Sequence, residues 1–295
     1  MPENHRVTVI APSQITQGEA GQFPFEFFAR RYLAQGDSWF SIGSLPPGLT
    51  SNVLAELELS KSTLVVNCAR PGKVLQHMTD TTTEGAFVRL LSGKLAMQWD
   101  AILLSCGGND LIDAAGVGPA APAHQRLLAT AAERGTPASG DGYISALGWA
   151  TFESHFDTVF NALIDRRDSG INRHVPLAFH TYAHLMPRPS PAGLGFGPWL
   201  APALTAFGVP AADWLAVSNA LIERLGTLLQ QLASARQAAD PACALHLVDT
   251  RTAALVLAGQ TDTGSSGDFL NEIHPTRGGY KKVAGVWRPT LDQLP

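Results

Sequence analysis

The sequence predicts an α/β protein with a doubly wound, parallel sheet of about five strands. One observation is a series of short, continuous apolar runs, which are typical of strands buried on both faces of a parallel sheet. These runs are RYLAQ before Gly36, 62–69, 99–108, 174–182 and 244–250. The other observation is a set of helix-like segments, at 51–61, 85–98, 151–167, 213–237 and 278–287. Strands that alternate with helices indicate βαβ units, and these build such a sheet.

The composition favours a single globular domain over residues 1–295. Hydrophobic residues make up 45% of the chain and charged residues 16%, which is enough apolar material for a large core. The formal net charge is −4 and no run of Lys or Arg occurs, so nucleic acid is not expected as a partner. Cys68, Cys106 and Cys243 are an odd number without a CxxC pair, which argues against a disulfide framework and a structural zinc site.

The N-terminus lacks the basic start and apolar core of a secretory signal. No stretch approaches the ~18 apolar residues of a membrane span. We therefore expect a cytoplasmic protein without a membrane span. Residues 1–30, which include FPFEFF, are expected to form an N-terminal extension that packs on the domain.

Two segments interrupt the alternation of strands and helices. Residues 111–145 are rich in Ala, Gly and Pro, and residues 185–210 carry the apolar side chains of Phe196, Trp199 and Leu200. Long irregular insertions in a compact domain are often lids or binding loops, although a tolerated surface excursion is the alternative for the first segment. The second is apolar enough to line a pocket.

Polar residues follow several of the expected strands, where the sites of doubly wound sheets form. Ser38 follows Gly-Asp, Gly72 follows Arg-Pro, and Asn109 follows Gly-Gly, whereas His274 lies near the C-terminus. Each has an ordinary alternative: a turn serine, a turn glycine, a helix cap and a surface histidine. Asp37 is expected to brace its turn by accepting backbone N–H bonds.

In this order, the pieces GDSW, NCARPG, GGND and DFLNEIHPTRGGY resemble the four sequence blocks of the SGNH (GDSL-type) hydrolases. The resemblance extends over about 32–287. It implies a three-layer α/β/α, flavodoxin-like fold in which Ser38 is the nucleophile and His274 its general base. It also implies an oxyanion hole formed by the Ser38 N–H, the Gly72 N–H and the Asn109 side chain. The chemistry fits these residue types, because a serine hydroxyl needs an adjacent base and the oxyanion needs donors.

The sequence departs from the family where an aspartate usually precedes the histidine by three residues. That position is Asn271, whereas Asp268 lies six residues before the histidine and Glu272 two before. Asp268 could reach the imidazole if the loop bends, Asn271 could orient it as an amide, or Ser38 and His274 could act as a dyad helped by a backbone carbonyl. Because an amide stabilises an imidazolium less than a carboxylate does, we expect Asp268.

The resemblance therefore implies a serine esterase that acts on small-molecule carboxylic esters with short to medium acyl chains. No metal or organic cofactor is expected. A carbohydrate O-deacetylase or a thioesterase would use the same residues, and a non-catalytic binding module is the alternative that Asn271 favours. His180 and His184 have a spacing that could hold a metal on a helix, but they are expected in a strand and its exit, so two unrelated histidines are expected instead.

Overall fold

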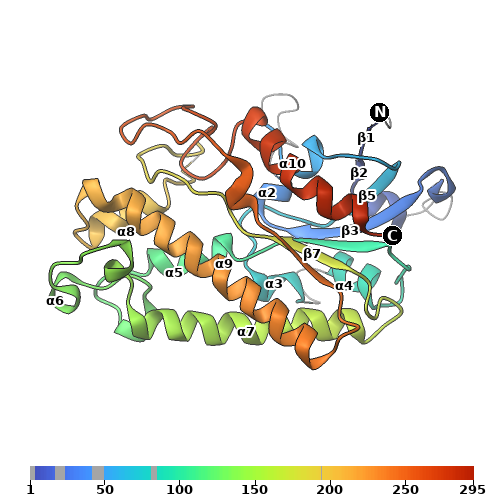
Figure 1. The fold of residues 1–295 in the computed structure, drawn as a ribbon, viewed down its shortest axis with the longest axis horizontal. Helices are drawn as coiled ribbons and strands as arrows, with labels where there is room; N and C mark the ends of the chain where they lie inside the picture. The colour runs from blue at the N-terminus through green and yellow to red at the C-terminus, as the bar shows by residue number, and fades with distance from the viewer. Residues whose placement is uncertain (1–3, 17–23, 42–49, 81–84, 194) are drawn as a thin grey trace.

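The computed structural model describes residues 4–16, 24–41, 50–80, 85–193 and 195–295. Its central sheet has six strands, whose neighbours all pair in parallel, in the order β2-β5-β3-β6-β7-β8 (Figure 1). The strands are β2 (Thr8–Ile10), β3 (Arg30–Gly36), β5 (Thr63–Asn67), β6 (Ala101–Ser105), β7 (Leu177–His180) and β8 (Leu245–Val248). Apart from the edge strand β2, this is the 2-1-3-4-5 order of a flavodoxin-like sheet. The expected fold class is confirmed, with one strand more than expected.

The additional strand comes from the N-terminal extension. β2 pairs with β5, with Val9 opposite Val65. Its outer residues Thr8 and Val9 are exposed, and three residues are too few to produce a readable apolar run. A second, two-stranded sheet pairs β1 (His5–Arg6) with β4 (Glu58–Leu59) in antiparallel orientation.

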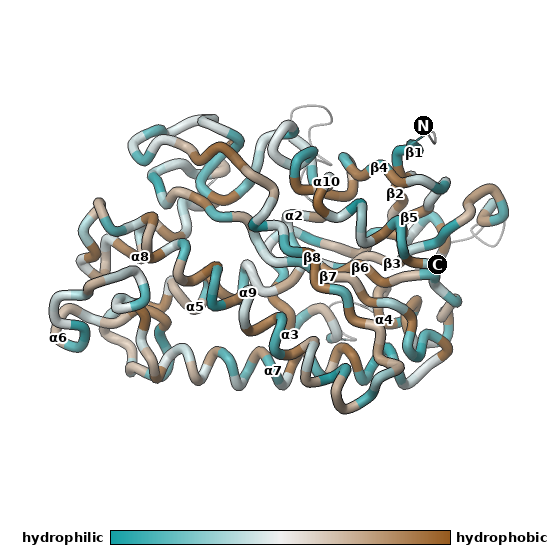
Figure 2. Tube along the Cα trace, viewed as in Figure 1, coloured by the Kyte–Doolittle hydropathy of each residue, from teal (hydrophilic) through white to brown (hydrophobic). Residues whose placement is uncertain are grey.

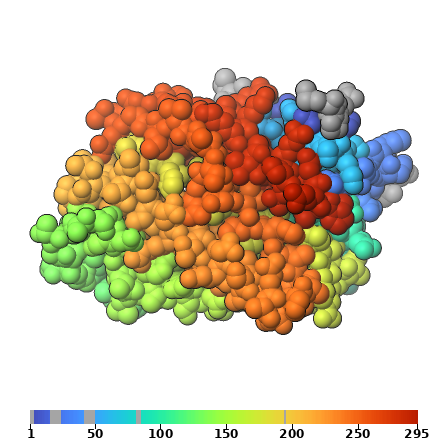
Figure 3. Space-filling view, in the orientation of Figure 1, coloured from blue at the N-terminus to red at the C-terminus, as the bar shows by residue number. Residues whose placement is uncertain are grey.

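Helices cover both faces of the sheet, as Figure 1 shows for α10 on one face and for α3, α4, α7 and α9 on the other. The helices are α1 (Ser13–Thr16), α2 (Ser38–Ser41), α3 (Leu75–Met78), α4 (Gly85–Leu91), α5 (Gly108–Gly116), α6 (Ala131–Arg134), α7 (Ala146–Asp168), α8 (Leu200–Ala206), α9 (Trp214–Ala239) and α10 (Arg277–Gln293). Hydrophobic residues gather on the central strands (Figure 2). The C-terminal part of the chain covers much of the face seen in Figure 3.

One expected helix is wrong. Residues 51–61 form a 3₁₀ turn at Leu54–Glu56 and then the strand β4. Leu54, Leu57 and Leu59 are all buried here, and Leu54 and Leu59 would lie about 140° apart around an α-helix. The extended form buries all three beside α10, which contacts β4. Tertiary packing therefore overrides the helix-like spacing.

The helix expected at 85–98 ends at Leu91. The N–H groups of Ser92 and Gly93 both donate to the Val88 carbonyl, which closes the helix, and Gly93 lies two residues beyond its end. Among the described residues, no helix combines the length and the apolar character that crossing a bilayer requires.

Candidate active site

Ser38 lies at the carboxyl end of β3, where it begins the short helix α2. The neighbouring strand β6 leads into α5 and Asn109, so both residues lie at the point where the strand order reverses. The strands approach closely here, because a Cβ on Gly36 would lie 2.7 Å from the Ser105 Cβ. Glycine at position 36 thus permits the turn that presents Ser38. In open α/β sheets this switch point is the usual place for a ligand.

His274 reaches Ser38 from the loop that precedes α10. The Ser38 Oγ lies 2.8 Å from the His274 Nε2, and both side chains are buried. The next helix starts immediately, with the Thr276 hydroxyl accepting the Gly279 N–H as its N-cap. The structure therefore brings together two residues that are 236 positions apart in the sequence.

Asn271 orients the imidazole from its other side. Its Oδ1 accepts the backbone N–H groups of Ile273 and His274, at 3.1 and 2.9 Å, which identifies this atom as the oxygen of the amide. The His274 Nδ1 lies 3.0 Å from the same oxygen and must therefore donate. This tautomer leaves Nε2 as the acceptor for the Ser38 hydroxyl proton. Burial lowers the pKa of His274 to about 4, so the imidazole is neutral at neutral pH.

The structure does not bring Asp268 to the imidazole. The Asp268 Oδ2 accepts the Lys282 ammonium and the Val256 N–H, both at 2.6 Å. A tight hairpin explains this placement, because Phe269 pairs with Pro275 across it. Asp268 thus lies at the base of the hairpin and turns outward, whereas Asn271 lies at its tip beside His274.

Glu272 and Arg188 hold this hairpin against the second inserted segment. The buried Glu272 carboxylate accepts the N–H groups of Arg188, Trp199, Leu200 and Ala201, and so lies at the start of α8. The Arg188 guanidinium donates to the Asn271 carbonyl at 2.9 Å, and to the carbonyls of Asp262 and Gly264. The roles of these two side chains cannot be read from the sequence, because the partners of both are backbone atoms of loops that are distant in the chain.

Asn109 and the Gly72 loop lie side by side. The Asn109 Nδ2 donates to the Lys73 carbonyl at 3.0 Å, and the neighbouring Asp110 carboxylate accepts the Leu75 N–H. Gly72 is exposed and has φ +75°, a conformation that favours glycine. One N–H of the Asn109 amide remains available for a further acceptor. Ser38 and Asn109 line the same cavity.

That cavity is apolar and has a volume of about 50 Å³. Ser38 and Asn109 lie at its polar wall. Its aliphatic wall comes from three helices and is formed by Leu111, Ile112, Ala115, Leu200, Leu221 and Ile222. Both inserted segments contribute, since Leu111 begins the first and Leu200 belongs to the second.

A buried polar network lies beneath Ser38. The Asp37 Oδ1 accepts the Trp39 N–H at 2.9 Å and the Ser105 hydroxyl at 2.7 Å, and the Tyr182 hydroxyl donates to Oδ2. The expectation that Asp37 braces its turn is confirmed by the Trp39 bond. Burial raises the pKa of Asp37 to about 6. Sequence analysis missed Tyr182 and Ser105, whose only signal is their place at the ends of adjacent strands.

The two histidines considered as metal ligands have other partners. The His180 Nε2 lies 2.9 Å from the Ser105 Oγ, and the His184 Nε2 lies 2.7 Å from the Glu223 Oε1. Within the described ranges, no group of three His, Cys, Asp or Glu side chains is arranged to hold a metal ion.

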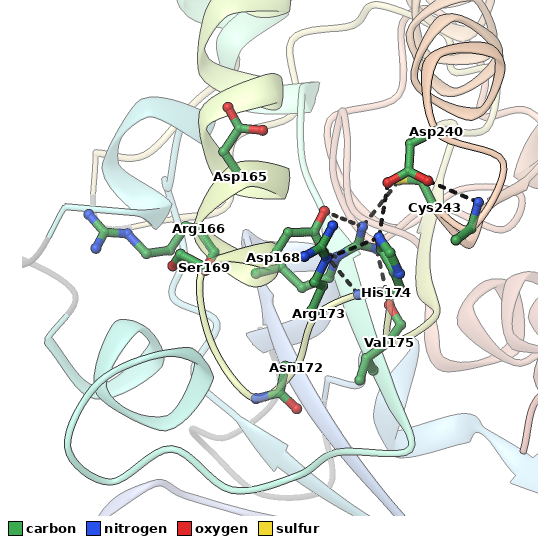
Figure 4. Close-up of polar contacts among 12 residues, drawn as sticks. Asp165, Arg166, Asp168, Ser169, Asn172, Arg173, His174, Val175, Asp240 and Cys243 are labelled. Carbon is green, nitrogen blue, oxygen red and sulfur yellow. Dashed lines mark hydrogen bonds and ion pairs between the residues drawn. The ribbon is translucent and has the colours of Figure 1, made fainter.

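A second polar cluster lies at the opposite, amino-terminal edge of the sheet (Figure 4). The His174 Nε2 lies 2.9 Å from the Asp240 Oδ2, and the His174 N–H donates to Asp168. The hydroxyl of Ser169 donates to the Arg166 carbonyl at 2.8 Å. The cluster joins the end of α7 to the end of α9, which is a structural role.

Comparisons with known proteins show a distant similarity in structure. A scan of protein-family models gives no match, and no curated protein matches in sequence. A putative SGNH hydrolase from Slackia heliotrinireducens matches with a TM-score of 0.45 and 15% identity over 89% of this chain and 99% of that one. Phospholipase A1 from Streptomyces albidoflavus matches with a TM-score of 0.46 and 14% identity, over 90% and 100% of the two chains.

An acetylxylan esterase from Geobacillus stearothermophilus has a TM-score of 0.42 and 11% identity, over 88% of this chain and 92% of that one. All three TM-scores lie below 0.5 and all three identities are 15% or lower, so these similarities do not assign this chain to a family. Similarity at this distance does not determine an activity, so function has to be inferred from the side chains of the site.

Proposed function

We propose that the protein is a serine esterase that hydrolyses carboxylic esters through a Ser38–His274–Asn271 triad. The observation that carries this proposal is the buried hydrogen bond of 2.8 Å between the Ser38 Oγ and the His274 Nε2. Asn271 fixes the tautomer in which that nitrogen is a base. A nucleophile, a base and an orienting group within hydrogen-bond reach are the geometric requirement for covalent acyl transfer.

The reaction takes place in two steps at these residues. The Ser38 Oγ attacks the ester carbonyl carbon while its proton passes to the His274 Nε2, and a tetrahedral oxyanion forms. The bond to the alkoxy oxygen then breaks, and His274 returns the proton to the leaving alcohol. Water attacks the acyl-enzyme with the same proton transfers and releases the carboxylic acid. The Ser38 N–H, the Gly72 N–H and the Asn109 amide are the proposed donors to the oxyanion.

The amide at position 271 limits how far the imidazolium is stabilised. An amide oxygen carries only a partial charge, whereas a carboxylate offers a full one. Asn271 therefore orients His274 without compensating for its buried positive charge. Since burial lowers the pKa of His274 to about 4, the residue acts as a weak base that remains neutral over most of the pH range.

The apolar cavity supports short to medium acyl chains as the substrate class. Its aliphatic lining leaves few groups to bind the hydroxyls of a sugar. Asn109 and Ala115 lie six residues apart on α5, which corresponds to about 9 Å along the helix axis. Ala115 is almost completely buried and lines the cavity at the far end of α5 from Asn109. A distance of about 9 Å between Asn109 and Ala115 suits an acyl chain of a few carbons.

A series of p-nitrophenyl esters from acetate to octanoate tests the proposal. The wild type should cleave short and medium esters, and Ser38→Ala should abolish this activity. Ala115→Leu should shift the preference toward acetate, because the larger side chain fills the cavity. Ala114→Leu is the matched control, since Ala114 lines a different groove on the other side of α5. Equal rates with all chain lengths in Ala115→Leu and the wild type would exclude this cavity as the acyl site.

Hydrolysis assays with acetylated sugars and acyl thioesters, run beside the p-nitrophenyl esters, separate the alternative functions. Cleavage of acetylated sugars alone would identify a carbohydrate O-deacetylase, and cleavage of acyl thioesters alone a thioesterase. No turnover of any of these compounds would favour a binding module.

A further inference from the structure

The carboxylate of Asp37 lies directly beneath the proposed nucleophile and connects three elements. Its donors are the Trp39 N–H in α2, the Ser105 hydroxyl at the end of β6 and the Tyr182 hydroxyl after β7. Asp37 is 2% exposed, and a carboxylate at such a site is costly unless several donors satisfy it. The three donors hold the backbone of residues 37–39, which presents the Ser38 hydroxyl.

Tyr182 contacts the opposite loop of the site as well. A Cβ on Gly108 would lie 2.6 Å from the Tyr182 ring, so this ring packs directly against the residue before Asn109. The ring also packs edge-on against Trp39, with centroids 5.1 Å apart. One side chain therefore contacts the neighbour of the proposed nucleophile and the neighbour of the proposed oxyanion donor.

We propose that Tyr182 and ionised Asp37 are positioning residues that hold Ser38 and Asn109 at the spacing acyl transfer requires. The proposal rests on the proposed function, because it assigns these two residues a role in that reaction. Neither residue exchanges a proton with the substrate. Their effect is on geometry, and a misplacement of about 1 Å can reduce an enzymatic rate about 10²-fold.

The ionisation of Asp37 makes this role dependent on pH. The ionisable groups around it are Cys106 at the end of β6, Asp110 in α5, His180 in β7, Tyr182 and Tyr280 in α10. None of them is a cation at neutral pH, because burial lowers the pKa of His180 to about 3. Burial therefore dominates and raises the pKa of Asp37 to about 6.

Protonation weakens the network, because bonds to a neutral carboxyl group are weaker than bonds to a carboxylate. We therefore expect activity to decrease as the pH falls through about 6. Protonation of His274 would reduce activity only near its own pKa of about 4. Burial also raises the pKa of Asp110 to about 7, so Asp110→Asn is measured beside Asp37→Asn to separate the three origins of an acid limb.

The test is the pH dependence of kcat and KM for p-nitrophenyl butyrate in the wild type, Asp37→Asn, Tyr182→Phe and Tyr280→Phe. Asp37→Asn should lose the limb near pH 6. Tyr182→Phe should move the limb to higher pH, because a lost donor raises the pKa of the carboxyl group. Its kcat should fall about 10-fold, with KM little changed, because the ring that lines the cavity remains.

Tyr280→Phe is the matched control. Tyr280 is buried and packs edge-on against the same Trp39, at 5.8 Å, but its hydroxyl forms no hydrogen bond within the described structure. Its variant should keep the wild-type profile. An unchanged limb in Asp37→Asn, or a Tyr182→Phe profile identical to that of Tyr280→Phe, would overturn the proposal.

The rate at which a fluorophosphonate labels Ser38 gives a second readout that does not depend on the choice of ester. If labelling of Ser38 shows the acid limb near pH 6 and its shifts in the variants, but no ester is hydrolysed, the esterase would be refuted and the positioning role supported. Ester hydrolysis without the shifts in the variants would refute the positioning role alone. If Asp37→Asn does not fold, the comparison of Tyr182→Phe with Tyr280→Phe still tests the positioning role.

Discussion

The two edges of the sheet each hold a histidine beside a side-chain oxygen, and their surroundings differ. At the carboxyl edge, His274 is 3% exposed, with the Asn271 amide on one nitrogen and the Ser38 hydroxyl on the other. At the amino edge, the side chain of His174 is 29% exposed and lies against the Asp240 carboxylate (Figure 4). The amino edge thus has the conventional histidine–carboxylate pair, and the carboxyl edge has an amide in its place.

This difference shows that position in the fold matters more than the presence of particular residue types. Ser169, His174 and Asp240 include all three residue types of a serine-hydrolase triad, but the Ser169 hydroxyl bonds to the Arg166 carbonyl. Ser38 lies where the strand order reverses, beside a cavity and above a buried carboxylate. At the carboxyl edge, the carboxylate of Asp37 lies under Ser38 instead of beside the imidazole of His274.

The largest expected effect is the difference in ester hydrolysis between variants of Ser38 and of Ser169. Ser38→Ala should lower kcat/KM for p-nitrophenyl butyrate by about 10⁴-fold or more, because removal of the nucleophile leaves only binding and oxyanion stabilisation. Ser169→Ala should keep the wild-type rate, since its hydroxyl contacts a carbonyl at the far edge. Steady-state kinetics of the two purified variants provide the measurement. A Ser38→Ala protein with a tenth of the wild-type rate would refute the proposed nucleophile.

The next largest effect on activity concerns Asn271, whose amide lies beside His274 where a carboxylate is usual. Asn271→Ala should lower kcat by about 10²-fold, because the imidazole loses its orienting acceptor. Asp268→Ala should change kcat little, since Asp268 bonds to Lys282 and Val256. Asn271→Asp should raise the pKa of His274, because the added negative charge stabilises the imidazolium. The acid limb that belongs to His274 would then move to higher pH, and a limb that does not move would contradict the assignment.

These assignments show what the sequence can and cannot predict. Ser38 and Asn109 are predicted to lie near one another, because residues after adjacent parallel strands meet at one edge of the sheet, whereas His274 follows no strand directly and its place beside Ser38 is implied only by the family resemblance. The choice between Asp268 and Asn271 depends on a tight hairpin, in which three residues decide whether a side chain lies at the base or the tip. No apolar pattern encodes that geometry.

The supporting residues are still harder to predict. Glu272 and Arg188 act on backbone N–H and carbonyl groups, which every residue type carries. The long helices α7 and α9 follow from their apolar spacing, whereas 51–61 has the same kind of spacing and forms a turn and a strand. Burial against α10 distinguishes these cases, and that contact exists only after the chain has folded.

A smaller effect concerns the buried carboxylate at the carboxyl edge. Burial raises the pKa of Asp37 to about 6, above its value of about 4 in the unfolded chain. The stabilising contribution of the protonated group is therefore complete below about pH 4 and is lost as the pH rises through about 6. Relative to Asp37→Asn, the wild type should lose about 3 kcal/mol of unfolding free energy in total, from well below pH 4 to well above pH 6. Urea unfolding at several pH values measures this difference, and a constant difference would contradict it.

The smallest effect should come from the exposed carboxylate at the amino edge. Asp240 has a lowered pKa, mainly because its carboxylate accepts the Ala242 N–H, with a further bond to His174. A lowered pKa in the folded state means that the contribution is present at neutral pH and is lost as the pH falls through the folded-state value. Because solvent screens this surface group, Asp240→Asn should alter thermal stability only slightly and leave ester hydrolysis unchanged. A marked loss of activity in Asp240→Asn would instead show that the two edges are coupled through α9 and β8.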